Sequence, residues 1–123
     1  MFYGPAADNV WGMKLPAGGN VLIEERKVIE YLLSRSHPVG RFKARVFAAL
    51  GFESKNIEAF ILELRRIAMA GEVSEVVETS FGKKFIVPGD LKGPLGELPV
   101  LTVWFLERGQ DRARLVTVRP RKS

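Results

Sequence analysis

The sequence contains no cysteine and only one histidine, His37. Without cysteine, the chain has no disulfide, no thiolate metal ligand and no cysteine nucleophile, and a single imidazole argues against a zinc site. No apolar run approaches the roughly 18 residues that a membrane span needs. The first residues, Met1–Pro5, lack the charged and apolar regions of a secretory signal. We therefore expect a cytoplasmic protein with no membrane partner.

Positive charge is concentrated at the C-terminal end of the chain. Its 123 residues suit one domain, and 46% hydrophobic with 27% charged residues describe a folded chain. Residues 1–107 contain 13 basic and 13 acidic residues, whereas residues 108–123 contain six basic and one acidic residue, which gives the whole net charge of +5. Such a segment is typical of proteins that bind polyanions, most often nucleic acid, but also of a solvated terminus that aids solubility.

The pattern of apolar residues changes near Gly71. Before it, helical spacing predicts three helices, over residues 24–35, about 38–50 and 54–70. After it, alternation predicts four strands, over residues 73–79, 83–87, 100–106 and 113–118. Residues 88–99 contain three glycines and three prolines and are expected to form a loop. The predicted fold is α+β, with three N-terminal helices followed by a four-stranded antiparallel meander.

The expected organisation has three parts. Residues 1–20 form a loose lead-in, because they are rich in Gly, Pro, Ala and Asn and show no period. Residues 21–120 form a single domain, and residues 121–123 form a basic tail. Met13 begins a more regular stretch, so either Met1 or Met13 is the natural start.

His37 lies beside two cations at a predicted helix start. Pro38 suits the first turn of a helix, and Arg41 and Lys43 follow it. Cations there oppose the helix dipole, so stability does not require them. Free N–H groups at a helix start can hold phosphate, an imidazole can move a proton near neutral pH, and cations can stabilise a pentavalent phosphate. Alternatively, His37 caps the preceding helix or fills a turn, and the cations are surface charges.

The last strand offers a second group of candidates. Alternation places Thr117 and Arg119 on one face. If the preceding turn closes symmetrically, Thr102 lies opposite Thr117, and Trp104 lies opposite Leu115. A face with hydroxyl groups, an indole and an arginine can hold a phosphate and stack a base. The alternative, which we favour for Trp104 taken alone, is that these residues are good strand formers packed in the core.

Residues for several other chemistries are missing from the sequence. It has no glycine-rich phosphate loop after a strand and no Gly-x-Ser-x-Gly motif. Its acidic residues do not form a compact cluster for magnesium. We therefore expect no metal and no cofactor, and any hydrolase activity would be metal-independent.

Several stretches resemble a bacterial family of unknown function, whose members occur as small stand-alone proteins and as C-terminal modules of polymorphic toxins. The similar stretches are Met13–Pro16, His37–Phe47, Leu50–Phe52, Thr102–Trp104 and Arg114–Thr117. The resemblance covers roughly residues 13–120, and the His-Pro-x-Gly-x-x-Lys-Ala stretch that begins at His37 is its most specific part.

The closing Leu-Val-Thr-x-x-Pro, residues 115–120, also resembles the end of the barnase–EndoU–colicin–RelE class of metal-independent ribonucleases. The resemblance implies helices before a four-stranded antiparallel sheet, with the active site on that sheet. In EndoU-like members a Ser or Thr, a Tyr and a Pro commonly close the last strand. Thr117 and Pro120 match this pattern, but Arg119 stands where the Tyr would be, so a tyrosine-assisted mechanism is not implied.

The first hypothesis is a toxin-type domain that cleaves RNA without a metal ion. The 2′-hydroxyl attacks its own phosphate, His37 acts as general acid or base, and Lys43 and Arg119 stabilise the pentavalent phosphate. Thr117 orients that phosphate or donates a hydrogen bond to it. The residues expected to bind the substrate are Arg41, Thr102, Trp104 and Arg114. A neutralising immunity or antitoxin protein, with an acidic surface that mimics RNA, is the expected partner.

Two other functions remain open. A non-catalytic module would use the same basic sheet to bind RNA, DNA or an acidic protein. The chain could also be an immunity or antitoxin-like partner, although its basic end argues against this. Convergence of His37, Lys43 and Thr117 within a few ångströms favours the enzyme, whereas scattered positions favour the binding module.

Overall fold

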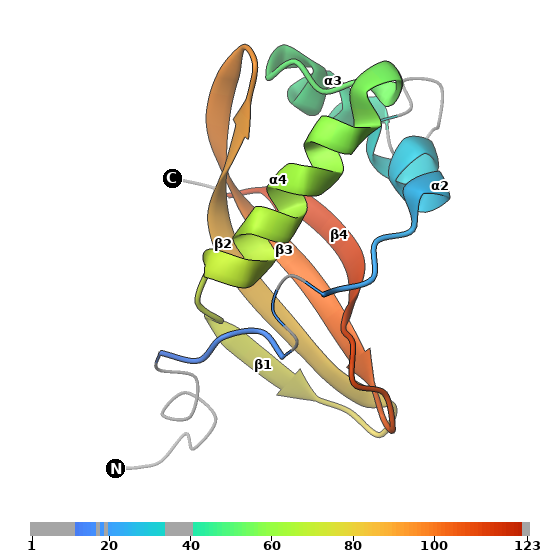
Figure 1. Cartoon of the computed structure of the whole chain (residues 1–123), viewed down its shortest axis with the longest axis vertical. Coiled ribbons are helices and arrows are strands. Elements are labelled where there is room, and N and C mark those ends of the chain that lie inside the picture. The colour runs from blue at the N-terminus through green and yellow to red at the C-terminus, as the bar shows by residue number, and fades with distance from the viewer. Residues whose placement is uncertain (1–11, 17, 19, 34–40, 122–123) are drawn as a thin grey trace.

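A computed structural model of the chain describes residues 12–16, 18, 20–33 and 41–121. The helical elements within these residues are α2 (Glu25–Lys27), which continues into the π-helical turn η1 (Val28–Leu33), then α3 (Arg41–Ala49), the short 3-10 turn η2 (Ser54–Asn56) and α4 (Ile57–Ala70). The strands are β1 (Glu75–Glu78), β2 (Gly82–Gly93), β3 (Gly96–Glu107) and β4 (Arg114–Pro120). In the described part of the chain, three helical segments precede a four-stranded antiparallel meander in the order β1-β2-β3-β4, which confirms the predicted fold (Figure 1).

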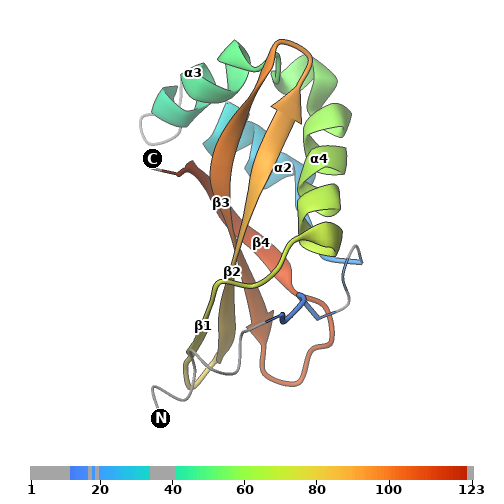
Figure 2. The same ribbon diagram turned by 90° about the vertical axis from the view of Figure 1, so that its left-hand side faces the viewer.

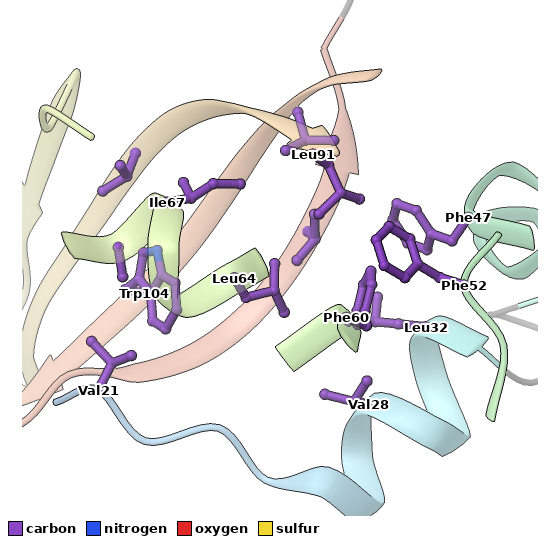
Figure 3. Close-up of a cluster of buried hydrophobic side chains, with 14 of the residues drawn as sticks. Val21, Val28, Leu32, Phe47, Phe52, Phe60, Leu64, Ile67, Leu91 and Trp104 are labelled. Carbon is purple, nitrogen blue, oxygen red and sulfur yellow. The ribbon is translucent and has the colours of Figure 1, made fainter. Parts of the chain in front are cut away.

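The core lies between α4 and the sheet. Figure 2 shows α4 along one side of the sheet and α3 across its upper end. Leu64 and Ile67 of α4 are buried beside the indole of Trp104 on β3 (Figure 3). The helical spacing of Phe60, Leu64 and Ile67 produces this apolar stripe, and each is at most 2% exposed.

Local chemistry explains the turn between α3 and α4. Gly51 has a φ of +96° and donates its N–H to Ala48 O at 2.9 Å, while Phe52 donates to Phe47 O at 3.0 Å. This is the hydrogen-bond pattern of a glycine that ends a helix. Ser54 opens η2, and reciprocal bonds between Glu53 and Asn56 cap the start of this turn.

Residues 88–99 do not form a loop. β2 and β3 pair continuously from Gly82 opposite Glu107 to Gly93 opposite Gly96, so the hairpin turn is short. The glycines of this segment allow close approach. A Cβ at Gly89 would lie 2.7 Å from Ile67, and one at Gly93 would clash with the carbonyl oxygen of Leu50. Packing against the helices thus accounts for glycines that local preference assigns to a loop.

The described residues before α2 are not a loose lead-in. Leu15 and Val21 are buried in the core. Leu22 donates its N–H to Ala113 O at 2.8 Å, and Leu115 donates to Leu22 O at 2.9 Å, which fixes this segment along the outer edge of β4. The packed domain therefore begins before residue 21. No described helix has the length and apolar character of a membrane span.

Candidate functional site

The centre of the candidate site is a hydrogen bond that joins α3 to β4. Lys43 Nζ donates to Thr117 Oγ1 at 2.7 Å. Lys43 lies in the first turn of α3, and Thr117 lies in the middle of β4, opposite Val103. Because the two residues are far apart in the sequence, only the crossing of α3 over the end of the sheet brings them together (Figure 2).

Lys43 and Thr117 line a pocket of about 250 Å³ between the helical segment and the edge of β4. Figure 1 shows α2 beside β4 on this side of the molecule. The remaining lining residues are Glu24, Lys27, Val28, Leu32, Leu115 and Val116. Glu24 and Lys27 approach each other, with 3.5 Å between Oε1 and Nζ. The pocket therefore combines an apolar wall with charged groups at its rim.

The electrostatics around Lys43 favour an anion. Partial burial, and secondarily the positive charge of Arg119, lower the pKa of Lys43 from its ordinary value. Two neighbouring cations repel each other, so this arrangement does not by itself stabilise the fold. An anionic group between them would relieve the repulsion and favour the protonated form of Lys43. Charged and polar donors of this kind bind a carboxylate or a phosphate.

The structure thus brings together three of the four predicted catalytic residues, Lys43, Thr117 and Arg119. His37 lies outside the described residues, and its role stays a prediction. Arg41 is the first residue of α3, so its backbone belongs to the helix start that was expected to hold phosphate. Glu24 and Lys27 line the pocket but were missed, because helix-surface charges at this spacing look like solvated residues.

The register of β3 and β4 differs in part from the prediction. Trp104 lies opposite Leu115, as symmetric closure of the turn predicts. Between this pair and the next, β4 contains one extra residue, so Thr117 lies opposite Val103 rather than opposite Thr102. Such a bulge displaces every later residue of the strand by one position. Thr102 and Thr117 consequently lie on opposite faces of the sheet.

Thr102 and Trp104 are core residues, so their assignment to a substrate-binding face is wrong. Both are fully buried. Trp104 Nε1 donates to Thr102 Oγ1 at 2.8 Å, and the Thr102 hydroxyl donates to Val87 O at 2.6 Å. Each polar group therefore has a partner within the core, and neither side chain is available to a ligand.

The same bulge places Arg114 on the face that carries Thr117. Arg114 lies opposite Phe105, and Thr117 lies opposite Val103. Phe105 and Val103 are two residues apart on β3 and share a face, so their cross-strand partners share it too. Without the bulge, strict alternation along β4 would put Arg114 and Thr117, three residues apart, on opposite faces. We refer to the face with Val103 and Phe105 as the outer face, because the opposite face carries the buried Trp104.

The family model that matches the sequence is Domain of unknown function (DUF6883), over residues 14–122. The chain belongs to this family. Among solved structures, the DUF6883 chain is similar to a chain of a contact-dependent growth inhibition toxin–immunity protein complex from Klebsiella pneumoniae 342. The TM-score is 0.67 and the identity 16%, over 85% of this chain and 96% of that chain. At this identity the similarity establishes the fold. No curated protein sequence matches the DUF6883 chain.

These comparisons confirm that the DUF6883 chain belongs to a family of unknown function, and they show a fold shared with a component of a toxin–immunity complex. The similarity to the ribonuclease class stays a prediction. In the described part of the DUF6883 chain, no three His, Cys, Asp or Glu side chains are grouped so that they could hold a metal ion.

Proposed function

We propose that this DUF6883 chain is a toxin-type domain that cleaves RNA without a metal ion. The observation that carries the proposal is the contact of Lys43 with Thr117 beside the charge of Arg119. Lys43 and Thr117 line a pocket of about 250 Å³ at the edge of the sheet, and the charge of Arg119 acts on Lys43 from nearby. Together these groups suit a phosphate with its sugar. An RNA substrate would place the activity in the cytoplasm.

The chemistry needs no nucleophile from the protein. The 2′-hydroxyl oxygen of RNA forms a bond to the adjacent phosphorus, and the bond from phosphorus to the 5′-oxygen breaks. A base accepts the 2′ proton and an acid gives a proton to the leaving 5′-oxygen, which yields a 2′,3′-cyclic phosphate and a 5′-hydroxyl. We assign proton transfer to His37, the only imidazole in the sequence.

Lys43, Thr117 and Arg119 would act on the charge that builds on the phosphate. The two cations lower the energy of the pentavalent dianion more than that of the singly charged ground state, which is the condition for catalysis. Thr117 Oγ1 accepts from Lys43, so its own O–H can donate to a non-bridging phosphate oxygen. The hydrogen bond also holds Lys43 in place before substrate binds.

The charge of the DUF6883 chain favours the toxin over the immunity protein. The similar fold comes from a complex that contains both. This chain carries a net charge of +5, all of which arises from residues 108–123, the segment that contains β4. A protein that neutralises such a site would present acidic groups, because it must occupy the place of RNA phosphates. We therefore expect an acidic immunity protein that covers Lys43 and Arg119.

The experiment is incubation of the purified protein with total RNA in the presence of EDTA. We expect cleavage by the wild type and a rate about a hundredfold lower for Lys43→Ala, the scale for loss of one electrostatic group. Lys43→Arg should restore activity only in part, because a planar guanidinium cannot reproduce the ammonium geometry. Lys55→Ala on η2, an exposed lysine outside the pocket, is the matched control and should cleave like the wild type.

Two results would overturn the enzymatic proposal. If the wild type binds RNA but leaves it intact in EDTA, the chain is a binding module. If it neither binds nor cleaves RNA, a nucleic-acid function as such is wrong.

A further inference from the structure

A second pocket, of about 130 Å³, lies along the same strand as the Lys43–Thr117 pocket. Its lining residues are Leu22, Phe105, Glu107, Gln110, Arg112 and Arg114. Arg114 directly precedes Leu115, which lines the larger pocket, and Leu22 lies two residues before Glu24 on its opposite wall. Both pockets therefore use neighbouring residues of β4 and of the segment that lies along its edge.

An aromatic ring and a guanidinium group form the inner surface of the small pocket. Arg114 lies over the ring of Phe105, with 5.5 Å from Cζ to the ring centroid. Its Nε donates to Glu107 Oε1 at 3.3 Å, which orients the guanidinium. Arg112 uses its Nε to bind Asn20 O at 2.8 Å and contributes a second positive charge to the wall.

We propose that this pocket binds an unpaired base of the RNA strand whose phosphate lies at Lys43 and Thr117. The inference rests on the proposed function and specifies its substrate as single-stranded or looped RNA. Bases stack on aromatic rings and on guanidinium planes, and both surfaces are present here. The carboxylate of Glu107 and the amide of Gln110 supply an acceptor and a donor that can bind the edge of a base.

The spacing of residues on β4 fits a base bound at Arg114 and a phosphate bound at Thr117. Arg114 and Thr117 share the outer face because of the bulge, and three residues of extended strand separate them by about 10 Å. Neighbouring nucleotides of an extended RNA strand can span that distance. A base within a duplex is stacked between its neighbours and cannot enter a pocket, so the site discriminates against paired RNA.

The test measures affinity for a short single-stranded RNA whose 2′-hydroxyl groups are methylated, so that it cannot be cleaved. Fluorescence anisotropy should show Phe105→Leu binding about tenfold more weakly than the wild type, as expected for one lost stacking contact. Phe81→Leu is the matched control: Phe81 is 77% exposed in the turn between β1 and β2, outside the small pocket. It should bind like the wild type.

An abasic strand of the same length separates base stacking from any effect on the backbone contacts. The wild type and Phe105→Leu should bind the abasic strand equally, and the wild type should bind the intact strand in preference to its duplex. If Phe105→Leu melts at a lower temperature, Arg114→Gln provides the same comparison with the ring retained. We expect it to lose affinity mainly for the intact strand.

The outcomes distinguish the two proposals. Wild-type protein that binds no RNA overturns the proposed function and this inference with it. Wild-type protein that binds RNA, while Phe105→Leu and Arg114→Gln bind it equally well, overturns the base pocket alone. An equal loss on intact and abasic strands also overturns it, because the contact would then not involve a base.

Discussion

Lys43 Nζ and Thr117 Oγ1 lie 2.7 Å apart although 74 positions separate the two residues in the chain. The hydrogen bond gives Thr117 a defined role in the site. Thr117→Val keeps the shape of the side chain but removes the acceptor for Lys43 and the proposed donor for phosphate. We expect RNA cleavage to fall by tenfold or more, at about the scale of one lost electrostatic contact.

Thr117→Ser is the matched comparison, because it keeps the hydroxyl group and should retain most of the activity. Initial rates on RNA and thermal melts of all three proteins would decide the point. Equal rates for the Val and Ser variants would mean that the hydroxyl of Thr117 has no part in the reaction.

Burial, and secondarily the charge of Arg119, should make Lys43 lose its proton at a lower pH than a free lysine. Burial and the charge of Arg119 lower the pKa of Lys43 from the ordinary 10.5, so the folded state favours the neutral amine more than the unfolded state does. The lowered pKa reduces the free energy of unfolding at every pH below the folded-state pKa. This destabilisation disappears as pH rises from that pKa toward 10.5. Activity that needs protonated Lys43 should therefore decline on the alkaline side at a pH below 10.5.

Arg119→Gln removes one cause of the shift, so it should raise the pKa of Lys43 and move the alkaline decline to higher pH. Glu24 and Lys27 of the opposite wall remain unchanged in this variant. An NMR titration of the Lys43 side chain measures the effect without depending on activity. An identical titration curve in the two proteins would contradict the account of how the two cations interact.

His37 is the proposed proton-transfer group, and its substitution gives a clear alternative outcome. His37→Ala should lower RNA cleavage about a hundredfold or more, the usual scale for a general acid or base. The melting temperature should not change. If His37 instead only caps a helix, the variant should melt earlier and retain its rate per folded molecule.

A Thr102→Val variant tests whether Thr102 and Trp104 are core residues rather than substrate-binding residues. Thr102→Val leaves Trp104 Nε1 and Val87 O without their buried partner, which should lower the free energy of unfolding by about 2 kcal/mol. The rate per folded molecule should stay the same. A lower rate with unchanged stability, measured by denaturant titration and initial rates, would restore these residues to the substrate-binding surface.

The sequence predicts the fold class well because the two periods are distinct. Phe60, Leu64 and Ile67 recur at helical spacing, and residues after Gly71 alternate, so helices precede strands. The sequence misplaces the turn of the β2–β3 hairpin, because a glycine can indicate either a loop or a position where another element packs closely. Only the position of α4 shows that Gly89 makes room for Ile67.

For the candidate site, the sequence predicts the types of functional group better than it predicts where those side chains lie. Lys43, Thr117 and Arg119 are predicted from their functional groups, and the structure brings them together. The bulge in β4 is invisible in the alternation pattern, because a single extra residue has no compositional signal. It moves Thr117 away from Thr102, and the site consequently forms at the edge of β4 rather than over the tryptophan.

The most direct test of the central claim is the chemistry of the ends that the protein leaves on RNA. Total RNA is incubated with the purified chain in EDTA, and the termini of the products are analysed for the wild type and for Lys43→Ala. The account predicts 2′,3′-cyclic phosphates and 5′-hydroxyl groups from the wild type, with these products about a hundredfold scarcer for Lys43→Ala. RNA that stays intact, or products with 3′-hydroxyl and 5′-phosphate ends, would contradict it.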